Sequence, residues 1–332
     1  MSAAPAEDIP GVLPSRAQAA SSVPAEKQAA LSVLAETALS LPAGTRAALS
    51  VPDGTRAALS VPAGTRAALS VPAGTRSVRP GAPVVSVWWA RVADARDSLA
   101  ALLDPAERAR YEEYRRPADR ARFLTAAALL RLVVGRMLDV APELVPLDRS
   151  CDRCGRPHGR PRLPAGTGAP STSWASAPVL SVSHAGDSLV VAVGVGVEAV
   201  GVDVEAIDHT LDIGELVGVA LTERETRALD ALDPPSRASA FLRLWTRKEA
   251  VLKALGVGLD HAPDQVDVLG TGEPVRVMTE QGEATLLSLN PPPGYHASLA
   301  VIRGPVPIVE CDGTGLLAGG TQKEHLWTGL PG

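Results

Sequence analysis

The chain has 332 residues and a net charge of −5, and 45% of its residues are hydrophobic against 21% charged. This composition is typical of a soluble globular protein with one large domain or two small ones. The negative net charge gives no indication of a nucleic-acid partner. The sequence contains no run of 18 apolar residues, so we expect no membrane span. With no signal-peptide pattern and only three cysteines, we expect a reducing cytoplasm as the compartment.

Residues 1–80 form a low-complexity extension built on the decapeptide Val-Pro-Ala-Gly-Thr-Arg-Ala-Ala-Leu-Ser. The unit repeats over residues 41–80, with Asp53 replacing one alanine and the last copy degraded. Proline and glycine in each unit interrupt helix propagation, and the period is too short for a helical solenoid. We therefore predict that residues 1–80 are largely disordered. The alternatives are a stacked repeat that docks a partner and a segment without function.

Residues 84–180 begin with a strand and continue with helices. The strand covers residues 84–90, and helices are predicted at 93–103, 105–114 and 117–138. Asp104 is the expected N-cap of the second helix, with Pro105 at its first position. A strand over residues 179–183 ends this part of the chain.

Residues 181–303 repeat the order of strand, helices and long helix. We predict strands at 189–195 and 199–207, helices at 213–221, 223–232 and 235–255, and strands at 266–269, 275–279, 284–289 and 295–302. Gly256 is the expected end of the long helix. Residues 304–332 are Gly-rich and unpatterned, which predicts a loose tail. The periodicity by itself supports a mixed α/β fold, also described as α+β.

Four side chains in residues 201–253 have the spacing of a phosphate-handling site. Asp203 and Glu205 lie two apart on a predicted strand, which puts both carboxylates on one face. Glu249 and Lys253 lie four apart on a predicted helix and share one face. Three carboxylates suit Mg²⁺, and a lysine reaches a phosphate oxygen. The alternative is a solvated strand face and an ordinary surface pair on the helix.

A third motif, Ser183-His184, precedes these two, and the three together resemble a known family. The ordered set is Ser183-His184, Gly201-Val202-Asp203-Val204-Glu205, and Trp245-x-x-Lys248-Glu249-x-x-x-Lys253. It is similar to the 4′-phosphopantetheinyl transferases, in particular the larger, monomeric Sfp-type branch that activates peptide synthetases and polyketide synthases. The resemblance covers residues 84–303.

The resemblance implies a fold, a reaction and partners. The fold would have two similar α/β halves, residues 84–180 and 181–303, related by a pseudo-two-fold axis with the active site in the cleft between them. The reaction would be Mg²⁺-dependent, with Mn²⁺ as a substitute. It would transfer the phosphopantetheine arm of coenzyme A to a serine of an apo acyl- or peptidyl-carrier protein and release 3′,5′-ADP. A monomer with no nucleic-acid or membrane partner is expected.

The resemblance also implies roles for single residues. Asp203, Glu205 and Glu249 would hold the metal, and Glu249 would also serve as the base, directly or through a bound water. Lys253 would contact the pyrophosphate, and Asp203, Glu249 and Lys253 form the expected catalytic set. Further coenzyme contacts are expected from residues of both halves, namely Arg110, Arg122, Arg160, Ser183 and His184. A loop histidine and a solvated helix face remain the alternatives for His184 and the arginines.

Cys151-x-x-Cys154 with His158 offers three zinc ligands. A structural zinc site needs four, and the sequence supplies no clear fourth ligand. We therefore favour a plain loop turn over zinc. Two other functions are kept as alternatives. The first is a metal-dependent nucleotide pyrophosphohydrolase, and the second is a non-enzymatic zinc-knuckle interaction protein.

Overall fold

The computed structural model describes residues 82–151, 154–157, 159–164, 166–167, 177–258, 261–270, 272–304 and 306–319. The predicted disordered extension over residues 1–80 lies outside the described residues, as does the end of the predicted tail from residue 320. Within the described ranges, every helix is too short or too polar to cross a membrane.

The first sheet has four strands and is covered on one face by helices, and its strands β3 and β8 come from outside residues 84–180. The strand order is β2-β3-β1-β8, and β1 pairs antiparallel with β3 and parallel with β8. Asp104 begins α2, because its side chain accepts a hydrogen bond from the Glu107 backbone N–H at 2.8 Å. The elements are β1 (Val84–Arg91), η1 (Val92–Asp94), η2 (Asp97–Leu102), α2 (Pro105–Glu113), α3 (Pro117–Leu138), η3 (Pro142–Leu144), β2 (Val179–Ala185) and β3 (Ser188–Val195).

The second half is an antiparallel sheet of four strands in the order β4-β7-β6-β5. Its long helix α6 ends at Gly256, which takes a left-handed conformation with φ of 73°. The elements are β4 (Ala199–Ala206), α4 (Gly214–Ala220), α5 (Glu223–Asp230), α6 (Pro234–Leu255), η5 (Pro263–Gln265), β5 (Val275–Thr279), β6 (Gly282–Ser288) and β7 (Tyr295–Ile302), and after them come β8 (Ile308–Asp312) and α7 (Thr314–Leu317).

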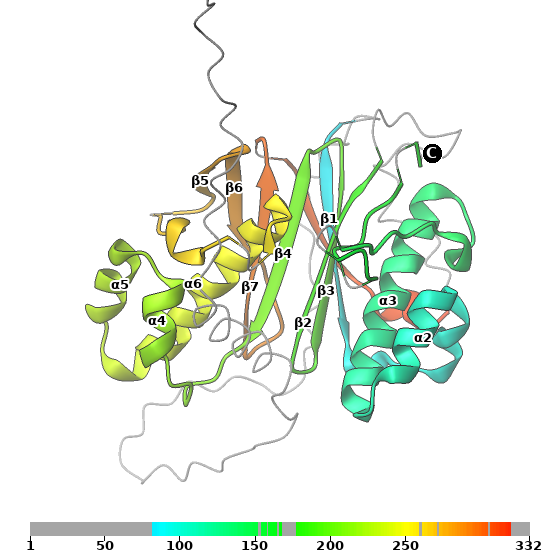
Figure 1. Ribbon diagram of the computed structural model, residues 1–332, viewed down its shortest axis with the longest axis horizontal. Helices are drawn as coiled ribbons and strands as arrows, with labels where there is room; N and C mark the ends of the chain where they lie inside the picture. The colour runs from blue at the N-terminus through cyan, green and yellow to red at the C-terminus, as the bar shows by residue number, and fades with distance from the viewer. Residues whose placement is uncertain are drawn as a thin grey trace, which may run out of the picture.

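The two sheets face each other and each carries helices on its outer face. Val85 and Val87 of β1 pack with Val202 and Val204 of β4 in the core between the sheets. Alternate residues of β1 face α3 instead, since successive strand residues point to opposite sides. Figure 1 shows α2 and α3 on one side of the sheets and α4, α5 and α6 on the other. The mixed α/β expectation is therefore confirmed, with four layers in the order helix, sheet, sheet, helix.

The element predictions agree closely with the structure, apart from three segments. The helix expected at 117–138 is confirmed, and the one expected at 235–255 begins one residue earlier, at Pro234. Residues 93–103 form the 3₁₀ helices η1 and η2 in place of a single helix.

The predicted strand over residues 266–269 is wrong. The backbone there bonds to side chains instead of a neighbouring strand. The Val266 carbonyl accepts from Lys248 Nζ at 2.6 Å, and the Val268 N–H donates to Glu225 Oε1 at 2.8 Å. A backbone whose polar groups are satisfied by buried side chains needs no strand partner.

The predicted loose tail over residues 304–332 is wrong for residues 308–317, which form β8 and α7. β8 adds the outer strand to the first sheet, beside β1. The Glu310 carboxylate accepts from Trp89 Nε1 at 2.9 Å and from Asn290 Nδ2 at 2.7 Å. This contact ties β1 to the loop between β6 and β7, so β8 is a member of the first sheet and α7 follows it.

Candidate active site

The face of β4 that points toward α6 carries two acids. Asp203 and Glu205 are 3% and 6% exposed, while Val202 and Val204 lie on the opposite face, in the core between the sheets. The predicted single-face arrangement of the two carboxylates is therefore present. Burial of both acids is costly unless charged or polar groups compensate them.

Gly201 allows α6 to lie directly on β4. A Cβ atom at this position would stand 2.0 Å from the Ala250 carbonyl oxygen and 2.4 Å from the Ala254 nitrogen. Only glycine fits such a close backbone approach. The approach brings the helix face with Glu249 and Lys253 against the acids of β4.

Lys253, Asp203 and Ser183 form one hydrogen-bonded cluster. Lys253 Nζ lies 2.6 Å from Asp203 Oδ1 and 3.0 Å from Ser183 Oγ, and the Ser183 hydroxyl donates to Asp203 Oδ1 at 2.8 Å. The other oxygen, Asp203 Oδ2, is buried and has no hydrogen-bond partner among the described residues. A buried carboxylate oxygen without a partner is unusual and suits a cation ligand.

The other two acids lie beside Asp203 in the same buried site. Glu205 Oε1 accepts from Trp245 Nε1 at 3.1 Å. Burial, followed by the charge of Asp203, raises the pKa of Glu205 well above its usual value. Burial also raises the pKa of Glu249 to about 7, with Lys253 opposing and Asp203 adding to the shift. Three acids share a single ammonium, so additional positive charge is favoured here.

These donors fit a hard divalent cation. The oxygens come from three carboxylates, which is the donor chemistry that Mg²⁺ and Mn²⁺ prefer. Asp203 Oδ2 is unpartnered, and the Glu249 carboxylate makes no hydrogen bond to any described residue. Within the described ranges, no three histidine, cysteine or acidic side chains are already arranged to hold a metal ion. Lys253 Nζ instead lies 2.6 Å from Asp203 Oδ1.

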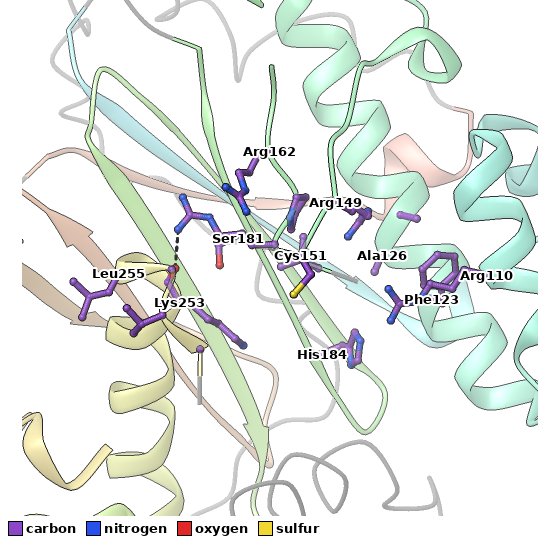
Figure 2. Close-up of a pocket in the computed structure, with 18 of the residues that line it drawn as sticks. Arg110, Phe123, Ala126, Arg149, Cys151, Arg162, Ser181, His184, Lys253 and Leu255 are labelled. Atoms are coloured by element: carbon purple, nitrogen blue, oxygen red, sulfur yellow. Dashed lines mark hydrogen bonds between the residues drawn. The ribbon is translucent and has the colours of Figure 1, made fainter. Parts of the chain in front are cut away.

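Lys253, which bonds to Asp203, is the member of this site that lines a cavity of about 720 Å³ between α3 and the C-terminal end of α6. Figure 2 shows Lys253 and Leu255 on one side of it and Arg110 and Phe123 on the other. Arg110 lies over the Phe123 ring, 5.5 Å from its centre. Four arginines line the cavity, namely Arg110, Arg149, Arg160 and Arg162. A concave site with several guanidinium groups suits a ligand with phosphates.

His184 lines the cavity in its neutral form. Burial, together with the charges of Arg122 and Lys253, lowers its pKa to about 4. Its Nδ1 atom is buried without a hydrogen-bond partner among the described residues. A neutral imidazole directed at the cavity offers one hydrogen bond to an anionic ligand without adding charge.

Several residues that were predicted as coenzyme contacts form hydrogen bonds within the protein. Arg122 is buried, donates to the Gly186 carbonyl at 3.1 Å, and does not line the cavity. Arg160 lines the cavity, but its Nη1 donates to the Lys253 carbonyl at 2.9 Å and thereby caps α6. Ser183 lies between Asp203 and Lys253, while Lys248 bonds to Glu225 at 2.6 Å in the core.

Arg149 and Arg162 were not predicted, although both line the cavity. Arg149 donates to Glu107 Oε1 at 3.2 Å, and Glu107 also accepts from the fully buried Arg131. Both cavity arginines belong to a loop, where no hydrophobic periodicity marks the direction of a side chain. The density of arginines in residues 149–162 is the signal that indicates them.

The zinc hypothesis receives no support from the described residues. Neither Cys151 nor Cys154 forms a disulfide, and His158 lies outside the described residues. The described chain contains no group of three histidine, cysteine or acidic side chains arranged for a metal.

This fold and site define an α/β protein suited to a phosphate-rich ligand between its two halves. The family model of the 4′-phosphopantetheinyl transferase superfamily matches residues 199–297. The chain belongs to the 4′-phosphopantetheinyl transferase superfamily, because it also matches a named member of that family over most of that member's length. That relative is the 4′-phosphopantetheinyl transferase HetI of Nostoc sp., 30% identical over 204 residues, which are 61% of this chain and 80% of HetI.

Two further comparisons cover less of the matched protein. A putative 4′-phosphopantetheinyl transferase of Synechocystis sp. is 31% identical over 166 residues, which are 50% of this chain and 62% of that protein. The chain thus spans a little over three-fifths of that relative's length. The crystal structure of Thermotoga maritima holo-[acyl-carrier-protein] synthase matches with 21% identity and a TM-score of 0.28, over 33% of this chain and 65% of that one.

Proposed function

We propose that this protein transfers the 4′-phosphopantetheine arm of coenzyme A to a serine of an apo acyl- or peptidyl-carrier protein and releases 3′,5′-ADP. The observation that carries the proposal is the contact between two sites. Lys253, which bonds to Asp203 and interacts with the charges of Glu249 and Glu205, is also part of the wall of the arginine-lined cavity. A pyrophosphate at that junction would have its adenosine end among arginines and its reacting phosphorus beside the acids.

Asp203, Glu205 and Glu249 would hold Mg²⁺, which when bound supplies positive charge that neutralises the pyrophosphate. Lys253 adds an ammonium at the same place, where negative charge moves from the attacked phosphorus to the leaving oxygen. His184 donates one hydrogen bond to a phosphate oxygen. Arg110, Arg149 and Arg162 hold the phosphorylated adenosine end by charge-assisted hydrogen bonds.

Glu249 takes the proton from the incoming serine, directly or through a bound water. The serine oxygen forms a bond to the β-phosphorus, and the bond from that phosphorus to the bridging oxygen breaks. The bridging oxygen leaves as part of 3′,5′-ADP. Without a metal ion, burial raises the pKa of Glu249 to about 7, and bound Mg²⁺ would lower it and keep the carboxylate ionised to accept the proton.

We also propose that the protein works as a cytoplasmic monomer whose halves are related by a pseudo-two-fold axis. In support, the fold has two four-stranded sheets, and each packs against one helix of 22 residues.

The test is incubation with coenzyme A, Mg²⁺ and a panel of apo carrier proteins, followed by mass measurement. We expect addition of the phosphopantetheine arm to the carrier and none after chelation of the metal. Asp203→Asn should reduce transfer by about 100-fold or more, because it removes a charge worth several kcal/mol in the transition state. Glu280→Gln, at an exposed acid, is the matched control.

Cleavage of coenzyme A without a carrier protein would point to a pyrophosphohydrolase and overturn the proposal. A folded Asp203→Asn variant that transfers at the normal rate would overturn the metal assignment.

A further inference from the structure

The Cys151-x-x-Cys154 motif has no part in the proposed transfer, yet it lies on the cavity. Cys151 is partly buried, lines the cavity, and directs its sulfur into it (Figure 2). Cys154 is exposed. Cys311, the third cysteine of the sequence, is buried, and burial raises the pKa of its thiol to about 11. The three thiols therefore differ in their exposure to solvent.

Backbone hydrogen bonds hold Cys154 close to Cys151. The Gly155 N–H donates to the Cys151 carbonyl at 2.8 Å, and the Cys151 N–H donates to the Arg156 carbonyl at 2.9 Å. Cys154 directly precedes Gly155, so its backbone lies near that of Cys151. Disulfides span Cα distances of about 4.4 to 6.8 Å, and this backbone closure favours an approach of that order between the two cysteines.

The surroundings of the turn are electropositive. Arg110, Arg149, Arg160 and Arg162 share the cavity wall with Cys151. Glu107 accepts a hydrogen bond from Arg149, but its carboxylate is shared with the buried Arg131. Cationic groups around a concave site concentrate anions there and increase their rate of encounter.

We propose that Cys151 is a thiol–disulfide exchange site for disulfides of small anionic thiols, with Cys154 as the resolving thiol. The Cys151 thiolate attacks one sulfur of the small disulfide, whose S–S bond breaks, and one small thiolate leaves and takes a proton from water. The Cys154 thiolate then attacks the Cys151 sulfur and releases the second small thiol. Two protein thiols are oxidised, and one small disulfide is reduced to two thiols.

The consequence concerns the cavity. A small thiol attached to Cys151 occupies the space between the arginines and therefore competes with any other anionic ligand. The regulatory part of this inference rests on the proposed function, because it identifies that ligand as coenzyme A. Oxidation would then stop transfer, and a reducing agent would restore it.

The first experiment measures where and how fast the thiols react. The reduced full-length protein is treated with coenzyme A disulfide, glutathione disulfide or uncharged 2-hydroxyethyl disulfide, and peptide mass spectrometry reads each cysteine. Every rate is divided by the rate of the same reagent with N-acetylcysteine amide, which removes intrinsic reactivity. We expect Cys151 to react roughly fivefold or more faster with the anionic disulfides than with the uncharged one, and the ratio to fall in 0.5 M salt.

Equal normalised rates for the three reagents would overturn the electrostatic argument. Reaction at Cys154 before Cys151, or reaction at the buried Cys311 at a comparable rate, would overturn the site itself. A faster rate for only one of the anionic disulfides identifies which thiol the cavity selects and supports the proposal.

The second experiment tests the resolving thiol and the effect on the ligand. Cys154→Ser should accumulate the mixed disulfide, whereas the unsubstituted protein should pass on to the internal disulfide. Equal lifetimes of the mixed disulfide in both proteins would refute the role of Cys154. Calorimetry with coenzyme A should show binding at least about tenfold weaker after glutathione is attached to Cys154→Ser, with recovery in dithiothreitol.

Binding that is unchanged by the attached glutathione would overturn the regulatory inference. Modification at Cys151 of a protein that never binds coenzyme A would instead count against the proposed function and leave the exchange site in place.

Discussion

The buried ion pair between Lys248 and Glu225 should carry much of the stability of the second half. Both side chains have no exposed surface, and Lys248 Nζ lies 2.6 Å from Glu225 Oε2. The same ammonium donates to the Pro263 carbonyl at 2.9 Å and to the Val266 carbonyl at 2.6 Å. Lys248→Met preserves most of the volume but leaves the Glu225 carboxylate and two carbonyls without this donor.

Removal of one partner of a buried pair costs about 3–5 kcal/mol. Glu225 keeps two backbone donors, the Thr222 and Val268 N–H groups, each at 2.8 Å. We therefore expect the lower end of the range, about 3 kcal/mol. In a folded unit of this size that loss corresponds to a fall in Tm of about 6–12 °C.

The assay is urea denaturation and thermal melting of three variants. Lys248→Met combined with Glu225→Gln should recover about 1–2 kcal/mol, because the amide removes the unpaired charge and keeps an acceptor. Arg276→Met, which breaks the exposed pair with Glu283, is the matched control and should cost less than about 1 kcal/mol. A Lys248→Met protein that melts with the unsubstituted one would refute the reasoning.

Three further predictions concern the site. Lys253→Ala should reduce kcat more than it reduces the affinity for the coenzyme. Lys253→Arg should restore only part of kcat, because a planar guanidinium replaces a compact ammonium. Steady-state kinetics and calorimetry test this, and equal losses of kcat and affinity would make Lys253 a plain binding residue. Gly201→Ala should lift α6 from β4, since the new Cβ would stand 2.0 Å from the Ala250 carbonyl, and should lower both Tm and transfer; unchanged melting and activity would contradict the close approach. The pKa of His184 is lowered to about 4 in the folded protein, so the fold favours the neutral imidazole. The free energy of unfolding is therefore unaffected by this histidine above the unfolded pKa of about 6.5 and decreases as the pH falls toward 4. The decrease is about 2 kcal/mol at pH 5. The stability profile of His184→Gln should lack this loss between pH 7 and 5, and parallel profiles would refute it.

Local signals explain why the elements could be predicted. The long helices are rich in alanine, leucine and arginine, which favour helix, and Gly256 marks the end of α6. Asp104 and Pro105 mark the start of α2. The strand predicted over residues 266–269 fails because its backbone bonds to Lys248 and Glu225, which are distant in sequence. β8 fails for the same reason, since its partner β1 lies more than 200 residues earlier.

Some site residues could likewise be predicted from the sequence, and others could not. Asp203, Glu205, Glu249 and Lys253 could be placed from spacing on a strand and a helix, and the structure brings them together. The arginines could not be assigned, because the direction of a long side chain depends on tertiary partners. Arg122 turns to the Gly186 carbonyl, whereas Arg149, in a loop without periodicity, reaches the cavity.

The position of β8 has a consequence for biosynthesis. β1 lies between β3 and β8, so the first sheet receives its last strand only after the whole second half has been made. At about 5–20 residues per second, the ribosome needs roughly 6–25 s to synthesise the segment between β3 and β8. During that interval β1 presents an open edge, which other chains can pair with. A nascent-chain chaperone that covers this edge would therefore raise the yield of folded protein more than one that acts after release.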